Sequence, residues 1–235
     1  MHVAFSLLMA IAPSLLLVRY FYKQDLKKPE PKGLVTKIFF LGIVFTIPAS
    51  IIEVLLDEFF NSLVAPAIVY SFIKAFIVAA CVEEIIKFII VRKFAYRNTH
   101  FDEEVDGIIY TIVASLGFAC MENLIYVIDG GLTIAFVRAF SAVPMHAVSS
   151  GIMGYYIGKA RFAGNKRDEK SLLLKGLWYA ILIHGVYDFL IFASPELGLV
   201  ITLGIFPLLV ITFFKLKEKI KLAITEDTNA GRHSA

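Results

Sequence analysis

Residues 105–128 read VDGIIYTIVASLGFACMENLIYVI, an apolar run with a glutamate and an asparagine near its C-terminal end. About 20 mainly apolar residues are enough to cross the hydrocarbon core of a bilayer as a helix. The run is therefore long enough to span a membrane. Inside such a span, Glu122 and Asn123 either clasp a neighbouring helix through hydrogen bonds or belong to a functional site.

Six further apolar runs of similar length lie on both sides of this stretch. Apolar residues make up 58% of the 235-residue chain and charged residues only 18%, whereas soluble domains have about 45–50% and about 25%. We therefore predict an all-α, polytopic membrane helix bundle that forms a single domain, residues 1–221, followed by a polar, disordered tail, residues 222–235. The seven predicted spans are residues 3–22, 35–56, 67–91, 105–128, 132–157, 172–193 and 197–215.

Lys and Arg residues are concentrated at alternate connections between these runs. Of the 23 basic residues, all but Lys74, Lys87 and Arg138 lie in or beside the connections that follow the first, third, fifth and seventh runs. Because cytoplasmic connections carry the excess of Lys and Arg, we predict an outside N-terminus and a cytoplasmic C-terminus. The net charge of +3 is too balanced for a protein that binds nucleic acid, so the expected surroundings are the lipid bilayer.

Ionisable residues recur inside the third to sixth runs. A charged side chain at the bilayer centre costs about 2.5–3.5 kcal/mol on insertion scales, which makes such residues functional candidates. Lys87 can neutralise one of Glu83 and Glu84 on its own helix, which leaves a second carboxylate over. His184 and Asp188 are four positions apart and share one helix face. The candidates are Glu83, Glu84, Lys87, Glu122, Asn123, His146, His184, Tyr187 and Asp188.

Three other charged residues in the spans receive a simpler interpretation. Lys74 and Arg138 lie near the outer ends of their runs, where a long side chain can reach the membrane interface. Glu53 is expected to do the same or to pair with one of these two bases. None of the three is expected to take part in the site.

The candidate residues suit the hydrolysis of an amide by activated water. A carboxylate can act as a general base or acid, and imidazole or amide donors can stabilise an oxyanion. The chain contains no GxSxG or HExxH motif, so the usual serine-hydrolase and helical zinc-protease signatures are missing. Cys81 and Cys120 lie singly in apolar runs and form no CxxC zinc motif.

Four motifs in order resemble the PrsW family of bacterial intramembrane proteases, which is related to the CAAX prenyl proteases and bacteriocin-processing enzymes. The resemblance covers residues 83–188. Lys87 replaces an arginine of the wider superfamily, and Glu122 replaces a histidine. Both departures match the PrsW branch and disfavour processing of prenylated proteins. The motifs are Glu83-Glu84-x-x-Lys87, Phe118-x-x-x-Glu122-Asn123, Pro144-x-His146 and His184-Gly-x-Tyr187-Asp188.

The resemblance implies a role for each matching residue. Glu83 and Glu84 would supply the carboxylate that activates water, one as the base and the other paired with Lys87. His184 and Asp188 would polarise the scissile carbonyl or steady the oxyanion. Glu122 would help to place water or share a proton, and His146 would complete the polar cavity. Supporting roles would fall to Lys87, Asn123 and Tyr187.

Both metal-free and zinc-dependent chemistry remain open for this residue set. His146 and His184 with either Glu122 or Asp188 would suit zinc in ligand type, and Glu83 would then act as the base. The metal-free mechanism is favoured here, and no cofactor is expected, because the two histidines do not share a helix turn.

The resemblance also implies a substrate and a place. A PrsW protease would cut a single-span, membrane-anchored anti-sigma factor near its extracytoplasmic face, in the bacterial cytoplasmic membrane, and so start a stress response. Two alternatives rest on the same polar residues. One is a proton-coupled transporter, and the other is a scaffold whose polar groups only clasp helices.

Overall fold

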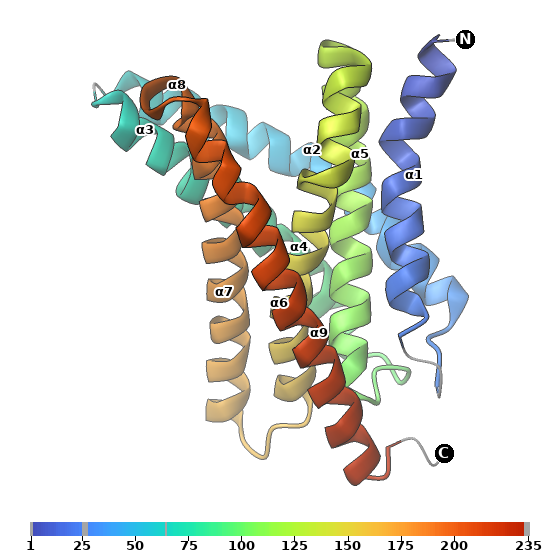
Figure 1. Ribbon diagram of the computed structural model, residues 1–235. Helices are drawn as coiled ribbons and strands as arrows, with labels where there is room; N and C mark the ends of the chain where they lie inside the picture. The colour runs from blue at the N-terminus through green and yellow to red at the C-terminus, as the bar shows by residue number, and fades with distance from the viewer. Residues whose placement is uncertain (1, 25–27, 64, 233–235) are drawn as a thin grey trace.

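The computed structural model describes residues 2–24, 28–63 and 65–232, and every regular element in them is helical (Figure 1). The prediction of an all-α fold is confirmed. The long helices form one bundle in which α5 takes the central place. The elements are α1 (His2–Tyr22), α2 (Lys32–Ser62), α3 (Ala67–Ile73), the π-helical η1 (Lys74–Cys81), α4 (Val82–Phe94), α5 (Glu104–Phe140), α6 (Ala142–Arg161), α7 (Lys166–Phe192), α8 (Ser194–Leu197), the 3-10 helix η2 (Leu199–Gly204) and α9 (Ile205–Asn229).

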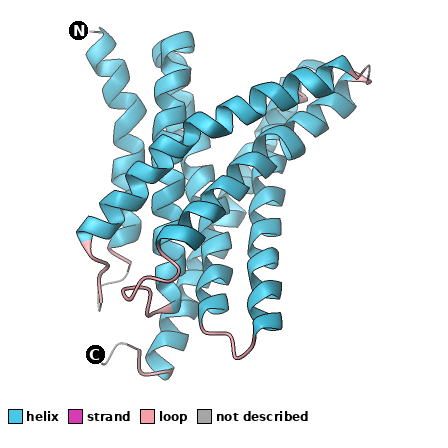
Figure 2. Cartoon of the chain, turned by 180° about the vertical axis from the view of Figure 1, so that it is seen from behind, coloured by secondary structure: helices cyan, strands magenta, loops and turns pink. Residues whose placement is uncertain are grey.

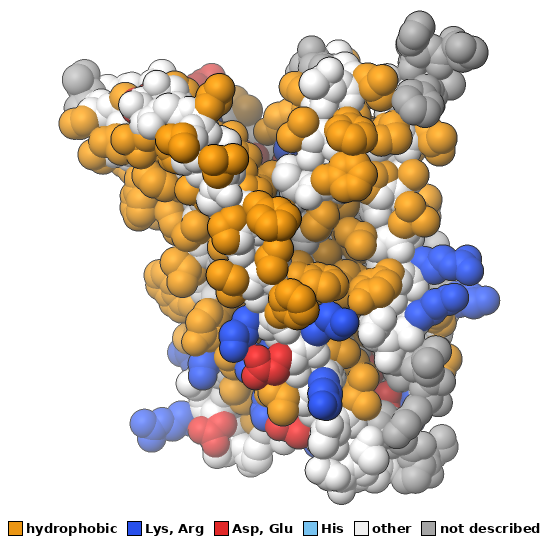
Figure 3. Space-filling view, viewed as in Figure 1, with side chains coloured by type: hydrophobic (Ala, Val, Ile, Leu, Met, Phe, Trp, Pro, Cys, Tyr) orange, Lys and Arg blue, Asp and Glu red, His pale blue; other side chains and the backbone are white. Residues whose placement is uncertain are grey.

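Five helical stretches are long and apolar enough to cross a membrane: Lys32–Ser62, Glu104–Ile128, Gly131–Arg161, Lys166–Phe192 and Leu199–Asn229. The two other predicted spans correspond to α1, whose apolar part is shorter, and to the continuous run α3–η1–α4, which the π-helical segment divides. The helix α1 begins at one end of the bundle and α9 ends at the other (Figure 1). On the face shown in Figure 3, Lys and Arg side chains gather toward the end where α9 finishes, and we call the opposite end the outer end.

The bundle is splayed at its outer end. Helix α2 has 31 residues and is therefore about 46 Å long, which allows it to run obliquely across the bundle (Figure 2). Together with α3 and η1 it leans away from α1 and α5, and Figure 3 shows the surface hollowed between these two arms. The buried residues of α2 lie only between Val35 and Ala49, so the rest of the helix toward the outer end is not buried by its neighbours.

Close backbone contacts hold α5 against its neighbours. All residues from 103 to 120 are buried. A Cβ atom added at Gly117 would lie under 3.0 Å from the backbone of Phe39 on α2, and one at Gly107 would meet the backbone of Gly154 on α6 just as closely. Small residues allow this approach of helix backbones in membranes.

Two irregular segments interrupt the helices at membrane depth. The π-helical η1 ends at Cys81, and α4 follows directly, with Glu83 and Glu84 in its first turn. The predicted span 132–157 is broken at Ser141, which has φ −122° and ψ −70°, five residues before His146. Irregular backbone is tolerated there only where protein or a cavity surrounds it. Both breaks therefore point to the same buried region.

The C-terminal part of the chain differs from the expected disordered tail. Helix α9 continues to Asn229, and residues 233–235 lie outside the described ranges. The buried Asp227 carboxylate accepts hydrogen bonds from the first backbone amides of α5, at 2.7 Å from Glu104 N and 3.1 Å from Val105 N. Arg232 Nη1 donates to Asp227 Oδ1 at 2.7 Å. Such a cap satisfies amides that have no partner within the helix, so the polar segment is ordered by α5.

Candidate active site

A cavity of about 310 Å³ lies between α2, η1, α4, α5, α6 and α7. Its wall combines apolar side chains with an unusually large number of ionisable ones for a region inside a membrane bundle. Most of the candidate residues that the sequence offers in the third to sixth spans line this one cavity. The ionisable residues of the wall are Glu53, Asp57, Lys74, Glu83, Glu122, Tyr126, Arg138, His146, His184, Tyr187 and Asp188.

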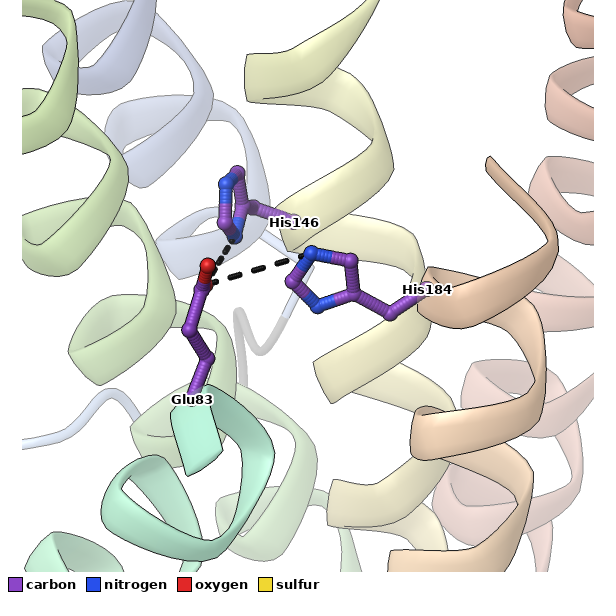
Figure 4. Close-up of side chains that lie close together, drawn as sticks. All are labelled: Glu83, His146 and His184. Carbon is purple, nitrogen blue, oxygen red and sulfur yellow. Dashed lines mark ion pairs between the residues drawn. The ribbon is translucent and has the colours of Figure 1, made fainter. Parts of the chain in front are cut away.

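Glu83, His146 and His184 form the centre of the cavity (Figure 4). They come from α4, α6 and α7, and each side chain is buried. Glu83 Oε2 lies 3.8 Å from His146 Nδ1 and 3.9 Å from His184 Nε2. One ligand atom from each residue lies within 4.8 Å of the others. Two imidazoles and a carboxylate at this spacing are donors that suit a zinc ion.

Lys87 contacts both neighbouring carboxylates. Its Nζ lies 2.9 Å from Glu83 Oε2 and 2.9 Å from Glu84 Oε1, and its side chain is completely buried. The same Nζ lies 2.9 Å from His146 Nδ1. Because an ammonium group can only donate, Nδ1 of His146 accepts and its hydrogen belongs to Nε2. Lys87 therefore sets the tautomer of His146 as well as the charge of the glutamates.

Glu84 lies behind the cavity wall and holds His184 in place. Its Oε1 lies 2.9 Å from His184 Nδ1, and its Oε2 accepts a hydrogen bond from Ser150 Oγ at 2.8 Å. A buried carboxylate on one ring nitrogen directs the other ring nitrogen toward the site, an arrangement common behind metal-bound histidines. Of the two adjacent glutamates, Glu83 is thus the one that faces the cavity.

His184 Nε2 and His146 Nε2 each have a second carboxylate nearby. Asp188 Oδ2 lies 3.2 Å from His184 Nε2, as the four-residue spacing predicts. Glu122 Oε2 lies 2.7 Å from His146 Nε2. Tyr187 also lines the cavity, and its hydroxyl donates to Ser141 Oγ at 3.1 Å, beside the break between α5 and α6.

Arg138 lines the cavity, contrary to the expectation that it would take no part in the site. Its Nη2 lies 3.3 Å from Glu122 Oε2, and its Nε donates to Asn123 Oδ1 at 2.7 Å. Asn123 Nδ2 in turn donates to the carbonyl oxygen of Ala10 on α1. The kink at Gly131 folds the end of α5 back so that Arg138 meets Glu122. Asn123 supports the site without lining the cavity.

Lys74 and Glu53 also differ from their expected placement. Lys74 Nζ lies 3.1 Å from Asp57 Oδ2 and lines the cavity. Glu53 lines the cavity too, and it forms an ion pair with neither Lys74 nor Arg138. A signal for Glu53 was present in the sequence, because it continues the helical spacing of the buried positions of α2.

Comparisons with known proteins agree with this geometry. The sequence model of a protein family described as PrsW family intramembrane metalloprotease matches residues 30–214 of this chain. Protease PrsW of Bacillus subtilis (strain 168) is 41% identical over 183 residues, 78% of this chain and 81% of that protein. Protease PrsW of Geobacillus kaustophilus is 39% identical over 196 residues, 83% of each chain. Protease PrsW of Clostridioides difficile is 33% identical over 188 residues, 78% of each. No solved structure matches the chain.

Proposed function

We propose a function for this chain on one premise: it belongs to the PrsW family of intramembrane proteases. It is accordingly a multi-pass membrane protein and a protease. The finer proposal is that it is a metal-dependent endopeptidase that cuts a single-span membrane protein inside the cavity. The observation that carries this proposal is the meeting of Glu83, His146 and His184 in one buried, polar-lined cavity.

These three residues would hold the metal ion, and zinc fits the donor set. The hydrogen bond between Glu84 and His184 supports this assignment because it leaves Nε2 of His184 directed at Glu83. When bound, zinc would polarise the scissile carbonyl and make water a stronger nucleophile. His146 and His184 come from different helices, so their separation in the sequence is no obstacle to a shared ligand set.

The surrounding residues hold charge and protons in place. Glu122 lines the cavity beside His146 Nε2 and is placed to exchange a proton with water or with the leaving amine. Arg138 balances the charge of Glu122 and links it to Asn123. Asp188 Oδ2 lies 3.2 Å from His184 Nε2, beside the ring nitrogen that faces the cavity.

A metal-free mechanism is the second candidate, and one observation favours it. Lys87 Nζ lies 2.9 Å from both Glu83 Oε2 and His146 Nδ1, so it already pairs with two of the residues that would hold the metal. In this mechanism Glu83 removes a proton from water, and His184 with Asp188 stabilises the oxyanion. The two candidates share the cavity and the substrate but differ in their need for metal.

Purified protein and a single-span model substrate can separate these mechanisms. Glu83→Gln should lower the cleavage rate by about 10²–10⁴-fold, whereas Glu58→Gln, at an exposed position of α2, should leave it unchanged. One equivalent of zinc, loss of cleavage with a chelator and recovery with added zinc would establish the metal mechanism. Chelator-resistant cleavage that still requires Glu83 would establish the metal-free one. Full activity of Glu83→Gln would contradict both.

We further propose that the substrate is an anti-sigma factor cut near the extracytoplasmic face of the bacterial cytoplasmic membrane. The cavity supports the position of the cut because its lining includes Asp57 and Phe192, near the outer ends of α2 and α7. Mass spectrometry of the products should place the cut on the outer side of the substrate span. A cut on the basic, cytoplasmic side would contradict this proposal.

A further inference from the structure

The inward face of α2 changes from small and apolar to acidic as it reaches the cavity. Glu53 and Asp57 both line the cavity, together with Val54, which is 56% exposed. The spacing of three or four residues shows that the acidic positions continue the same helix face. The buried positions that precede them are Val35, Ile38, Gly42, Thr46 and Ala49.

Glu53 differs from the other carboxylates of the cavity in having no partner. Asp57 pairs with Lys74, and Glu122 pairs with Arg138. The remaining two are also paired, Glu83 with Lys87 and Asp188 with His184. Glu53 Oε1 is buried and has no hydrogen-bond partner, and Glu53 forms no ion pair within the part of the chain that the structure describes.

An unpartnered carboxylate in this position lowers the stability of the folded bundle, because it forms no contact that offsets its lost hydration. A buried polar group without a hydrogen bond loses its hydration with no compensation, and charged groups inside membranes are usually paired or functional. Packing alone would be served better by an apolar residue at position 53. The missing partner is therefore supplied by whatever enters the cavity.

The chemistry of the wall indicates what that partner is. Lys74 and Arg138, the bases that line the cavity, are already engaged by Asp57 and Glu122. A positive charge that enters the cavity would therefore find in Glu53 a carboxylate with no competing base, and a negative charge would be repelled. We propose that Glu53 determines substrate specificity by pairing with a Lys or Arg side chain close to the scissile bond. This inference rests on the proposed protease function.

The test is a panel of single-span model substrates that carry Lys, Gln or Glu in turn at each position flanking the cut. The full-length protein in lipid nanodiscs should cleave the best Lys substrate about 10–100-fold more efficiently than its Gln counterpart, as expected for a charge-assisted hydrogen bond. Most of this difference should appear in KM. Glu53→Gln should remove the preference, and Glu53→Lys should reverse it toward Glu. Glu58→Gln is the matched control and should keep the wild-type preference.

Two outcomes would overturn the inference. One is a wild-type enzyme that cleaves Lys, Gln and Glu substrates equally well, and the other is a Lys preference that survives in Glu53→Gln. Direct binding of the same peptides to the Glu83→Gln protein, with and without Glu53→Gln, keeps the question separate from catalysis. A Glu53-dependent preference in binding without any cleavage by the wild-type protein would uphold the inference and reject the protease function. Equal binding of all three peptides would reject the inference alone.

Discussion

The two sides of the cavity are built in different ways. We define the packed region as α5 and α6, and the wall as α2, η1 and α4. In the most apolar stretch of α5, 78% of the residues are buried, compared with 22% in α2. The packed region contributes the paired groups Glu122, Arg138 and His146, whereas the wall contributes the unpartnered Glu53. A tightly packed region keeps catalytic groups in place, and a loosely covered wall can move to admit a substrate helix.

The largest effect is expected where the two regions meet, at Lys87. Lys87→Met leaves the buried Glu83 and Glu84 without their cation, and breaking a buried ion pair in this way costs about 3–5 kcal/mol. The protein should unfold at a lower temperature in detergent and lose cleavage. Lys74→Met is the control, because its pair with Asp57 is about one third exposed and is worth about 1 kcal/mol or less. If both substitutions lowered the unfolding temperature and the cleavage rate equally, the buried contacts of Lys87 would not hold the wall against the packed region.

A smaller effect is expected inside the packed region. Gly107→Ala places a Cβ under 3.0 Å from the backbone of Gly154, so α5 and α6 must separate. Overpacking of this kind costs about 1–3 kcal/mol, which thermal unfolding would detect. Gly33→Ala on α2 should cause no loss of stability, since nothing lies within 4 Å of the added atom. An unchanged unfolding temperature in Gly107→Ala would remove the distinction between a packed and a loose side.

The smallest effect is expected on the outer surface of the wall. Leu55 is 61% exposed, so Leu55→Ala should change the free energy of unfolding by no more than about 0.5 kcal/mol. Cleavage should also be unaffected, since Leu55 lies outside the cavity lining. A marked loss of activity without a loss of stability would show that this surface, and not the cavity face, receives the substrate.

Local patterns in the sequence were sufficient to predict much of the site. The positions of Glu83, Lys87, His184 and Asp188 follow from three- and four-residue spacings, which the regular geometry of a helix determines. The apolar runs and the alternation of basic connections were likewise enough for the all-α bundle. These features depend on short stretches of chain or on their order, which can be read without knowing how the helices pack.

The features that were missed depend on breaks in helices and on contacts between distant segments. The break at Gly131 falls between the predicted spans 105–128 and 132–157, but the spans do not show that Arg138 would turn inward and meet Glu122. The missing partner of Glu53 could not be predicted, since pairing is decided by the neighbours that α2 meets. The expectation of a disordered tail failed for the same reason, because Asp227 is ordered by a helix start far away in the sequence.

That last contact has a consequence for biosynthesis. Asp227 closes the first turn of α5 from a position 123 residues later in the chain. When the central helix enters the membrane, the residue that completes it has not yet been translated. The start of α5 can therefore acquire its final form only after residue 227 has been translated, and a chain cut short at residue 221 would leave the start of its central helix open.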